Sequence, residues 1–238
     1  MVMSVMSVEF QNLNMIHKKK ILVAPSILSA DFGKLNQEIA DVEPYCDLIH
    51  VDIMDGHFVP NLSLGVPVLE SIRCGKPLDV HLMIENPEKY LDVFAKAVKK
   101  SVGADLYKKS YLVFHIETVR DPLKTVRAVH ELGLLAGIAL NPDTELNKVS
   151  AEVLREVDMV LLMTVYPGFG GQQFIAAVMP KIERLRETCP ELHIEVDGGI
   201  NQQTARFAVQ AGANILVAGS YVFGAKDRKA ALITLKEF

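Results

Sequence analysis

Cysteine is scarce in this sequence of 238 residues, which has only Cys46, Cys74 and Cys189. Their number is odd, and no two of them have the C-x-x-C spacing. The sequence therefore argues against a disulfide framework and against a zinc site built from thiolates. Such sparse use of cysteine is typical of a reducing compartment, so we expect a cytoplasmic protein.

Strong positive charge and long hydrophobic runs are also missing. The formal net charge is −4 and no stretch forms a basic stripe, so nucleic acid is not expected as a partner. No apolar run is long enough to span a bilayer, so no membrane partner is expected. The first 20 residues lack the basic start and apolar segment of a secretory signal. We expect residues 1–20 to be a loosely ordered extension.

No linker or change of composition divides the rest of the chain, so residues 21–238 are expected to form one catalytic domain. Hydrophobic residues make up 50% of the sequence, enough for a sizeable core. Short aliphatic or β-branched runs recur, each followed by an amphipathic stretch. The predicted strands are 21–26, 47–54, 77–83, 111–117, 134–140, 158–165, 193–198 and 214–219. The predicted helices are 33–43, 65–73, 87–99, 121–132, 145–156, 177–188, 202–211 and 226–237.

Regular alternation of strands and helices predicts an α/β fold in which crossover helices join parallel strands. Eight such units match a single (β/α)8 TIM barrel. The alternative is a doubly wound open sheet. It would use fewer strands, and the glycine-rich dinucleotide turn after the first strand is missing.

Histidine and acidic side chains gather near the carboxyl ends of the predicted strands, where a barrel builds its active site. Because side chains alternate along a strand, those of one parity should point into the barrel. These are His50 and Asp52 on the second strand, Asp79 and His81 on the third, and Glu195 and Asp197 on the seventh. Two imidazoles and two carboxylates in a confined space suit a divalent metal ion. The alternative is that each histidine only forms hydrogen bonds within the barrel. Asp55 has the other parity and begins a loop, so we expect it to anchor that loop.

Two glycine-rich segments follow the sixth and eighth predicted strands. Residues 166–174, YPGFGGQQF, are too long for a simple turn, and residues 218–220, AGS, precede a helical stretch. Late barrel loops and helix N-termini often bind phosphate. Together with DGG at 197–199, these segments favour a phosphate site over plain turns.

Taken together, the motifs resemble those of the ribulose-phosphate 3-epimerase family. The matching stretches are APSILSADF (24–32), HVDIMDGHFVPNL (50–62), DVHLM (79–83), LNP (140–142), PGFGGQ (167–172), EVDGGI (195–200) and VAGSYVF (217–223). They follow one another in order and cover almost the whole chain from Ile21 onward. The resemblance implies a TIM barrel of the ribulose-phosphate-binding type. It also implies an enzyme that interconverts D-ribulose 5-phosphate and D-xylulose 5-phosphate.

The resemblance also implies roles for individual residues. Asp52 and Asp197 would be the catalytic acid–base pair, which transfers protons at C3 through a metal-stabilised enediolate. One divalent ion per chain would be held by His50, Asp52, His81 and Asp197, with zinc the first choice and Fe²⁺, Mn²⁺ and Co²⁺ as alternatives. The implied substrate-binding residues are Ser26, His81, Gly168, Phe169, Gly170, Gly171, Gly198, Gly199, Gly219 and Ser220. The methionines expected to line the reaction centre, with ordinary core packing as the alternative, are Met54, Met83 and Met163.

Some departures from the family pattern leave the sugar open. Tyr166 stands where the family usually has asparagine, while MTV (163–165) and LNPDT (140–144) look like allulose-6-phosphate 3-epimerases. A D-allulose-6-phosphate 3-epimerase or another ketose-phosphate 3-epimerase is therefore an alternative. The partners expected are a ketose phosphate and further copies of this chain, as a dimer or a hexamer.

Two alternatives have a different chemistry. A non-catalytic sugar-phosphate-binding barrel would keep the glycine loops but would not need a carboxylate on each face of the sugar. A metal-dependent aldolase or decarboxylase typically needs a lysine at the reaction centre, and no predicted strand end offers one. Both alternatives fit the sequence less well than an epimerase.

Overall fold

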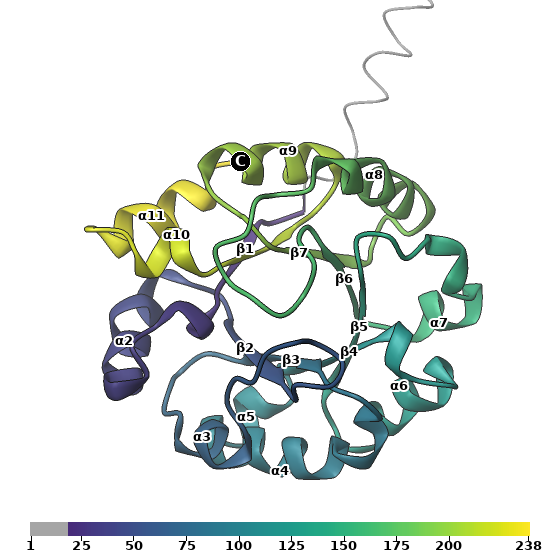
Figure 1. Cartoon of the computed structure of the whole chain (residues 1–238), viewed down its shortest axis with the longest axis horizontal. Helices are drawn as coiled ribbons and strands as arrows, with labels where there is room; N and C mark the ends of the chain where they lie inside the picture. Colours follow the sequence, from purple (N-terminus) through teal and green to yellow (C-terminus); the bar gives the residue numbers. More distant parts are fainter. Residues whose placement is uncertain (1–18) are drawn as a thin grey trace, which may run out of the picture.

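The computed structural model describes residues 19–238, so all but the last two residues of the expected extension, 1–20, lie outside the described part. Within it, parallel strands alternate with helices around a central barrel (Figure 1). The strands are β1 Leu22–Pro25, β2 Ile49–Met54, β3 Leu78–Met83, β4 Tyr111–His115, β5 Leu135–Leu140, β6 Met159–Met163, β7 His193–Asp197 and β8 Ile215–Ala218. The helices are α2 Leu35–Val42, α3 Val66–Ser71, α4 Leu91–Val102, α5 Ala104–Tyr107, α6 Pro122–Glu131, α7 Ala151–Glu156, α8 Met179–Thr188, α9 Gln202–Ala211, α10 Ser220–Phe223 and α11 Arg228–Leu235. Short 3₁₀ helices lie at Ile27–Ser29, Phe32–Lys34, Glu43–Tyr45, Pro87–Lys89, Ile116–Thr118, Leu146–Lys148 and Ala176–Val178.

The strands form one sheet in the order β1-β8-β7-β6-β5-β4-β3-β2, and every neighbouring pair is parallel. The two outermost strands of this order meet through an isolated parallel bridge between Ser26 and His50. The sheet therefore curls into a nearly closed barrel with the helices outside it (Figure 1). The predicted (β/α)8 fold is confirmed, and the open doubly wound sheet is excluded.

Every predicted strand and helix is present, but several ends differ. The fourth predicted strand was too long, because Ile116–Thr118 turns into a 3₁₀ helix. The predicted helix 145–156 was too long at its start, because the Ser150 side chain caps α7 by accepting from the Val153 N–H. Residues 121–132 were predicted well, because Asp121 caps α6 and a proline follows it.

Residues of β2 show how the barrel separates two environments. All six residues of this strand are buried. Ile49, Val51 and Ile53 belong to the hydrophobic core under the helices, whereas His50 and Asp52 point into the barrel. Buried polar groups are stable only when they are paired, so these two side chains need partners inside the barrel. Among residues 19–238, no helix is both long enough and apolar enough to cross a bilayer.

Candidate active site at the carboxyl rim of the barrel

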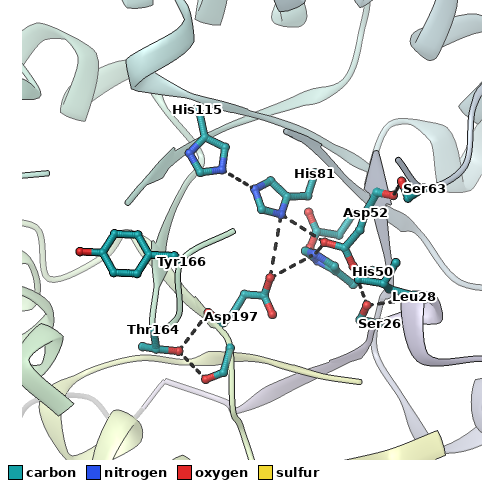
Figure 2. A network of polar contacts seen from close by, with 12 residues as sticks. Ser26, Leu28, His50, Asp52, Ser63, His81, His115, Thr164, Tyr166 and Asp197 are labelled. Atoms are coloured by element: carbon teal, nitrogen blue, oxygen red, sulfur yellow. Dashed lines mark hydrogen bonds and ion pairs between the residues drawn. The ribbon is translucent and has the colours of Figure 1, made fainter. Parts of the chain in front are cut away.

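Four side chains predicted to hold a metal ion converge at the carboxyl rim (Figure 2). In the register of β2 and β3, Asp52 lies opposite His81. Asp197 ends β7, on the other side of the barrel mouth. One potential ligand atom from each of His50, Asp52, His81 and Asp197 lies within 4.8 Å of the other three. The structure thus brings together residues that are far apart in the sequence.

The two imidazoles face the same pair of carboxylate oxygens. His50 Nε2 lies 3.3 Å from Asp52 Oδ1 and 3.9 Å from Asp197 Oδ2. His81 Nδ1 lies 3.5 Å and 3.9 Å from these same two oxygens. His81 Nδ1 is buried and has no hydrogen-bond partner in the protein. An orphaned imidazole nitrogen beside two carboxylates fits a divalent cation, because these are the donors that zinc and ferrous iron bind.

The surroundings of the cluster give the two aspartates different pKa values. Burial, followed by repulsion from Asp52, raises the pKa of Asp197 to about 7. Burial also tends to raise the pKa of Asp52, but attraction to His50, the hydrogen bond with His50 and attraction to His81 outweigh it and hold that pKa well below its usual range. Two carboxyl groups whose proton affinities are pushed apart are suited to opposite acid and base roles.

Two further side chains hold the cluster in place. Ser26 Oγ donates a hydrogen bond of 2.6 Å to Asp52 Oδ2. Asp79 Oδ2 lies 2.5 Å from His50 Nδ1, so Nε2 is the His50 nitrogen that faces the cluster. Ser26 was predicted as a substrate contact. In the structure its hydroxyl bonds to Asp52, and the residue also lines the cavity above the cluster.

Glu195 lies beneath the cluster, inside the barrel, fully buried. It forms a second close group with His50 and Asp79, yet neither carboxylate oxygen has a hydrogen-bond partner. Burial, followed by repulsion from Asp79, raises the pKa of Glu195 well above its usual range. The sequence parity placed Asp79 and Glu195 inside the barrel but assigned neither a role, because side-chain direction alone does not identify a partner.

Thr164 is a site residue that the sequence analysis missed. Its Oγ1 donates to the carbonyl oxygens of Asp197 and Gly198 at 2.9 and 2.7 Å, and its N–H donates to the same Asp197 carbonyl. These bonds fix the end of β7, which carries Asp197. A threonine directly after a strand has no special signal in sequence, so only the structure reveals this contact.

A cavity opens above the cluster, between the loops that follow the strands. Most of the residues predicted for the site surround this cavity. They are Ser26, Asp52, Met54, Met83, Met163, Gly168, Phe169, Gly170, Gly171, Asp197, Gly198, Gly199, Gly219 and Ser220. His81 is the exception among the predicted substrate contacts. It is fully buried below the cavity, in contact with the aspartates.

Glycines follow two strand ends that approach other segments closely. Gly198 has a φ of +123°, and a Cβ there would lie 2.5 Å from Val165 Cγ2. A Cβ on Gly219 would lie 2.6 Å from Ser29 Oγ. A side chain does not fit at Gly198, whereas at Gly219 the Ser29 hydroxyl would have to rotate away, and the backbone at both positions borders the cavity.

Side-chain amides form hydrogen bonds to the backbone of the loop after β6. Asn61 Nδ2 donates to the Gly168 carbonyl at 2.7 Å, and Gln172 Nε2 donates to the carbonyls of Tyr166 and Phe169. Tyr166 and Phe169 are more than half exposed, and the Tyr166 hydroxyl points away from the cluster (Figure 2). The loop therefore borders the cavity while the rings of Tyr166 and Phe169 remain largely exposed to solvent.

Asp55 anchors the loop after β2, as its parity predicted. Its Oδ1 accepts from the N–H groups of His57 and Phe58, and its Oδ2 accepts from the N–H of Glu85. The carboxylate thus joins the loops that follow β2 and β3. This prediction is confirmed.

The fold and the site together define a TIM-barrel enzyme with a cluster of histidine and aspartate open to a glycine-walled cavity. Residues 22–223 match the sequence model of the ribulose-phosphate 3 epimerase family. A ribulose-phosphate 3-epimerase from Bacillus subtilis is 49% identical over 224 residues, covering 91% of this chain and 98% of that protein. The chloroplastic ribulose-5-phosphate-3-epimerase of Arabidopsis thaliana is 46% identical over 226 residues, covering 92% of this chain and 77% of that protein. The chain belongs to the ribulose-phosphate 3-epimerase family, and its reaction is the epimerisation of ribulose phosphate at C3.

A more distant likeness extends to solved structures. A structure of KGPDC from Streptococcus mutans aligns with a TM-score of 0.68 at 12% identity, covering 91% of this chain and 96% of that one. At this level of identity the likeness shows the barrel fold alone.

Proposed function

We propose that this enzyme interconverts D-ribulose 5-phosphate and D-xylulose 5-phosphate with Asp52 and Asp197 as its two acid–base groups. One observation carries the proposal: the buried carboxyl group of Asp52 and the partly buried carboxyl group of Asp197 lie on separate strands and line the same cavity. Inversion at C3 requires a proton to leave one face of the sugar and another to arrive on the opposite face. A carboxyl group on each face is the simplest way to provide this.

The proton transfers use the two groups in opposite roles. In one direction Asp52 is the base that takes the proton from one face of the sugar, and Asp197 is the acid that returns a proton to the other face. In the reverse reaction the two exchange roles. Ser26 fixes the Asp52 carboxylate through Oδ2, and Thr164 fixes the strand end that carries Asp197. Each proton donor or acceptor is thereby held in a defined place before the sugar binds.

The donor set fits one divalent ion per chain. His50, Asp52, His81 and Asp197 would hold it, and the orphaned His81 Nδ1 supports this assignment. When bound, the ion supplies Lewis-acid stabilisation of the negative charge that develops on the sugar oxygens. We propose zinc as the first choice, with ferrous iron, manganese or cobalt as alternatives, because all accept imidazole and carboxylate ligands.

The glycine segments are proposed to hold the phosphate group. Gly168 to Gly171 and the pair Gly219 and Ser220 border the same cavity from two sides. Backbone N–H groups there can approach an anion without intervening side chains. The segment 167–173 is proposed to close over the sugar and exclude water. Hydrogen bonds from the side-chain amides of Asn61 and Gln172 to its backbone would hold it in the closed position.

Three methionines complete the wall around the reaction centre. Met54, Met83 and Met163 are at most 5% exposed and line the cavity. Met54 and Met83 lie opposite each other in the register of β2 and β3, and Met163 lies opposite Asp197. We propose that their soft, uncharged thioethers keep water from the sugar without competing for its oxygens.

The choice of sugar is tested by proton exchange in deuterated water. Purified enzyme is incubated with D-ribulose 5-phosphate or with D-allulose 6-phosphate, and uptake of deuterium at C3 is followed by NMR. We expect faster exchange with the pentulose, because the similar proteins from Bacillus subtilis and Arabidopsis thaliana are both named for ribulose phosphate. Faster exchange with the hexulose would make the enzyme an allulose-6-phosphate 3-epimerase. No exchange with any ketose phosphate would favour a non-catalytic binding barrel.

Further proposals concern the state of the protein in the cell. We propose a homo-oligomer, a dimer or a hexamer, on the resemblance to the family alone, and light scattering at micromolar concentration tests it. We propose a cytoplasmic location because Cys46, Cys74 and Cys189 are all free thiols. Residues 21–238 are proposed as one catalytic domain, because a single sheet runs through them.

A further inference from the structure

A line of polar contacts leads away from the cluster on the side opposite Asp52 and Asp197 (Figure 2). His81 Nε2 lies 2.9 Å from His115 Nε2, and both side chains are fully buried. On its other side, His115 Nδ1 lies 3.1 Å from Glu117 Oε2. The proton transfers described above use neither His115 nor Glu117, so the purpose of this line needs its own explanation.

The local fold builds this line from two positions that are neighbours in sequence. His115 ends β4, and the 3₁₀ turn Ile116–Thr118 folds Glu117 back so that its carboxylate reaches His115. Glu117 is itself held from the next loop, because its Oε1 accepts from the N–H of Asn141 and from Thr144 Oγ1. The carboxylate is therefore fixed in position and presents Oε2 to the imidazole.

The positions of the protons follow from donors and acceptors along the line. A carboxylate only accepts, so the hydrogen between Glu117 and His115 belongs to His115 Nδ1. A neutral His115 then has only a lone pair at Nε2, so His81 must donate from its own Nε2. In a neutral His81 ring only one nitrogen carries a hydrogen, so Nδ1 has none, and this is the orphaned atom that faces Asp52 and Asp197.

We propose that Glu117 and His115 are positioning residues that hold His81 in the one tautomer whose Nδ1 can bind a metal ion. The inference rests on the metal centre of the proposed function. The other histidine of the cluster shows the complementary arrangement, since Asp79 occupies His50 Nδ1 and leaves Nε2 for the cluster. The two histidines thus offer different ring nitrogens, and each choice is set by the partner on the far side of the ring.

Metal affinity of three variants tests the positioning role. His115→Phe keeps a ring but removes the acceptor for His81 Nε2, and it should weaken cobalt binding about 10- to 100-fold in a chelator competition. His115→Gln restores an acceptor oxygen and should recover most of that affinity. His130→Phe makes the same exchange at an exposed histidine on α6 that bonds to Asp158, and it should bind cobalt like the wild type. Melting temperatures verify that each variant is folded.

A second measurement needs neither activity nor metal. Nitrogen NMR of metal-free wild-type protein with isotopically labelled histidine reports which ring nitrogen carries the hydrogen. We expect it on Nε2 of His81 and on Nδ1 of His115. In His115→Phe we expect the His81 signals to show a mixture of tautomers.

The outcomes separate this inference from the function on which it rests. A hydrogen on Nδ1 of His81 in the wild type would overturn the positioning role. So would a folded His115→Phe variant that binds cobalt as tightly as the wild type. A wild-type protein that binds no cobalt would overturn the metal centre itself, and the inference with it.

Discussion

Ser26 donates to the Oδ2 oxygen of Asp52 at 2.6 Å, so the residue that follows β1 restrains the base that β2 carries. Ser26→Ala should therefore lower kcat/KM by about 30-fold, because a hydrogen bond to a charged group is worth roughly 2 kcal/mol. Initial rates on the ketose phosphate measure the effect. Ser71→Ala removes a surface hydroxyl of α3 and serves as the matched control. Equal rates for both variants would show that Asp52 needs no such restraint.

Loss of either acid–base group should nearly stop turnover. Asp52→Asn and Asp197→Asn should each lower kcat at least about a hundredfold, which corresponds to roughly 3 kcal/mol of barrier. Both residues are also proposed ligands, so metal content is measured on the same samples. Near wild-type turnover in either variant would refute the assignment of two acid–base groups.

Removal of the metal ion should abolish activity reversibly. Dialysis against a strong chelator should leave inactive, folded protein, and added zinc, manganese, cobalt or ferrous ion should restore turnover. The ion that restores most activity at the lowest concentration identifies the preferred metal. Full activity in protein verified as metal-free by elemental analysis would contradict the proposal.

Stability of the metal-free protein should depend on the protonation of His115. Burial, only partly opposed by its hydrogen bond with Glu117, lowers the pKa of His115 to about 4, below the usual value of 6.5. As pH falls from about 6.5 to about 4, His115 binds a proton in the unfolded chain but not in the folded protein. The free energy of unfolding therefore decreases by up to about 3 kcal/mol. This contribution is complete above about pH 6.5.

Urea unfolding of wild type and His115→Phe at about pH 7 and about pH 4.5 measures the combined contribution of His115 and its contacts with His81 and Glu117, because groups outside these contacts affect both proteins alike. The wild type should lose more stability than the variant over this interval. Parallel losses would mean that His115 takes up its proton without unfolding.

The loop after β6 should respond to a loss of backbone freedom. Gly170→Pro restricts the loop and removes one N–H group from the proposed phosphate site. KM for the phosphorylated sugar should rise and kcat should fall, while metal content and melting temperature stay nearly unchanged. Unaltered kinetics in a folded, metal-loaded variant would mean that the loop is a static turn.

Much of this architecture is predictable because it rests on periodic patterns. The repeat of strand and helix predicts the barrel, and the alternation along β2 and β3 predicts that His50, Asp52 and His81 share its interior. Element ends are less predictable, since they depend on local competition such as the Ser150 cap or the turn after His115.

Contacts between strands are harder to foresee. The pairing of Asp79 with His50 and of His81 with His115 depends on register and on side-chain rotamers, neither of which is encoded in a periodic pattern. Thr164 contributes through backbone carbonyls that any residue of β7 offers. The sequence could therefore identify which residues gather at the rim, but not which of them hold others in place.

Closure of the barrel has a consequence for synthesis of the chain. β1 has its full ladder only with β8, the last strand to be made, and meets β2 through the single bridge at Ser26 and His50. A nascent chain on the ribosome therefore exposes β1 without its main partner until β8 has emerged. Asp197 on β7 also arrives late, long after His50, Asp52 and His81. We expect the complete ligand set, and with it tight ion capture, to form only in the final stage of folding, which keeps unfinished chains from sequestering metal.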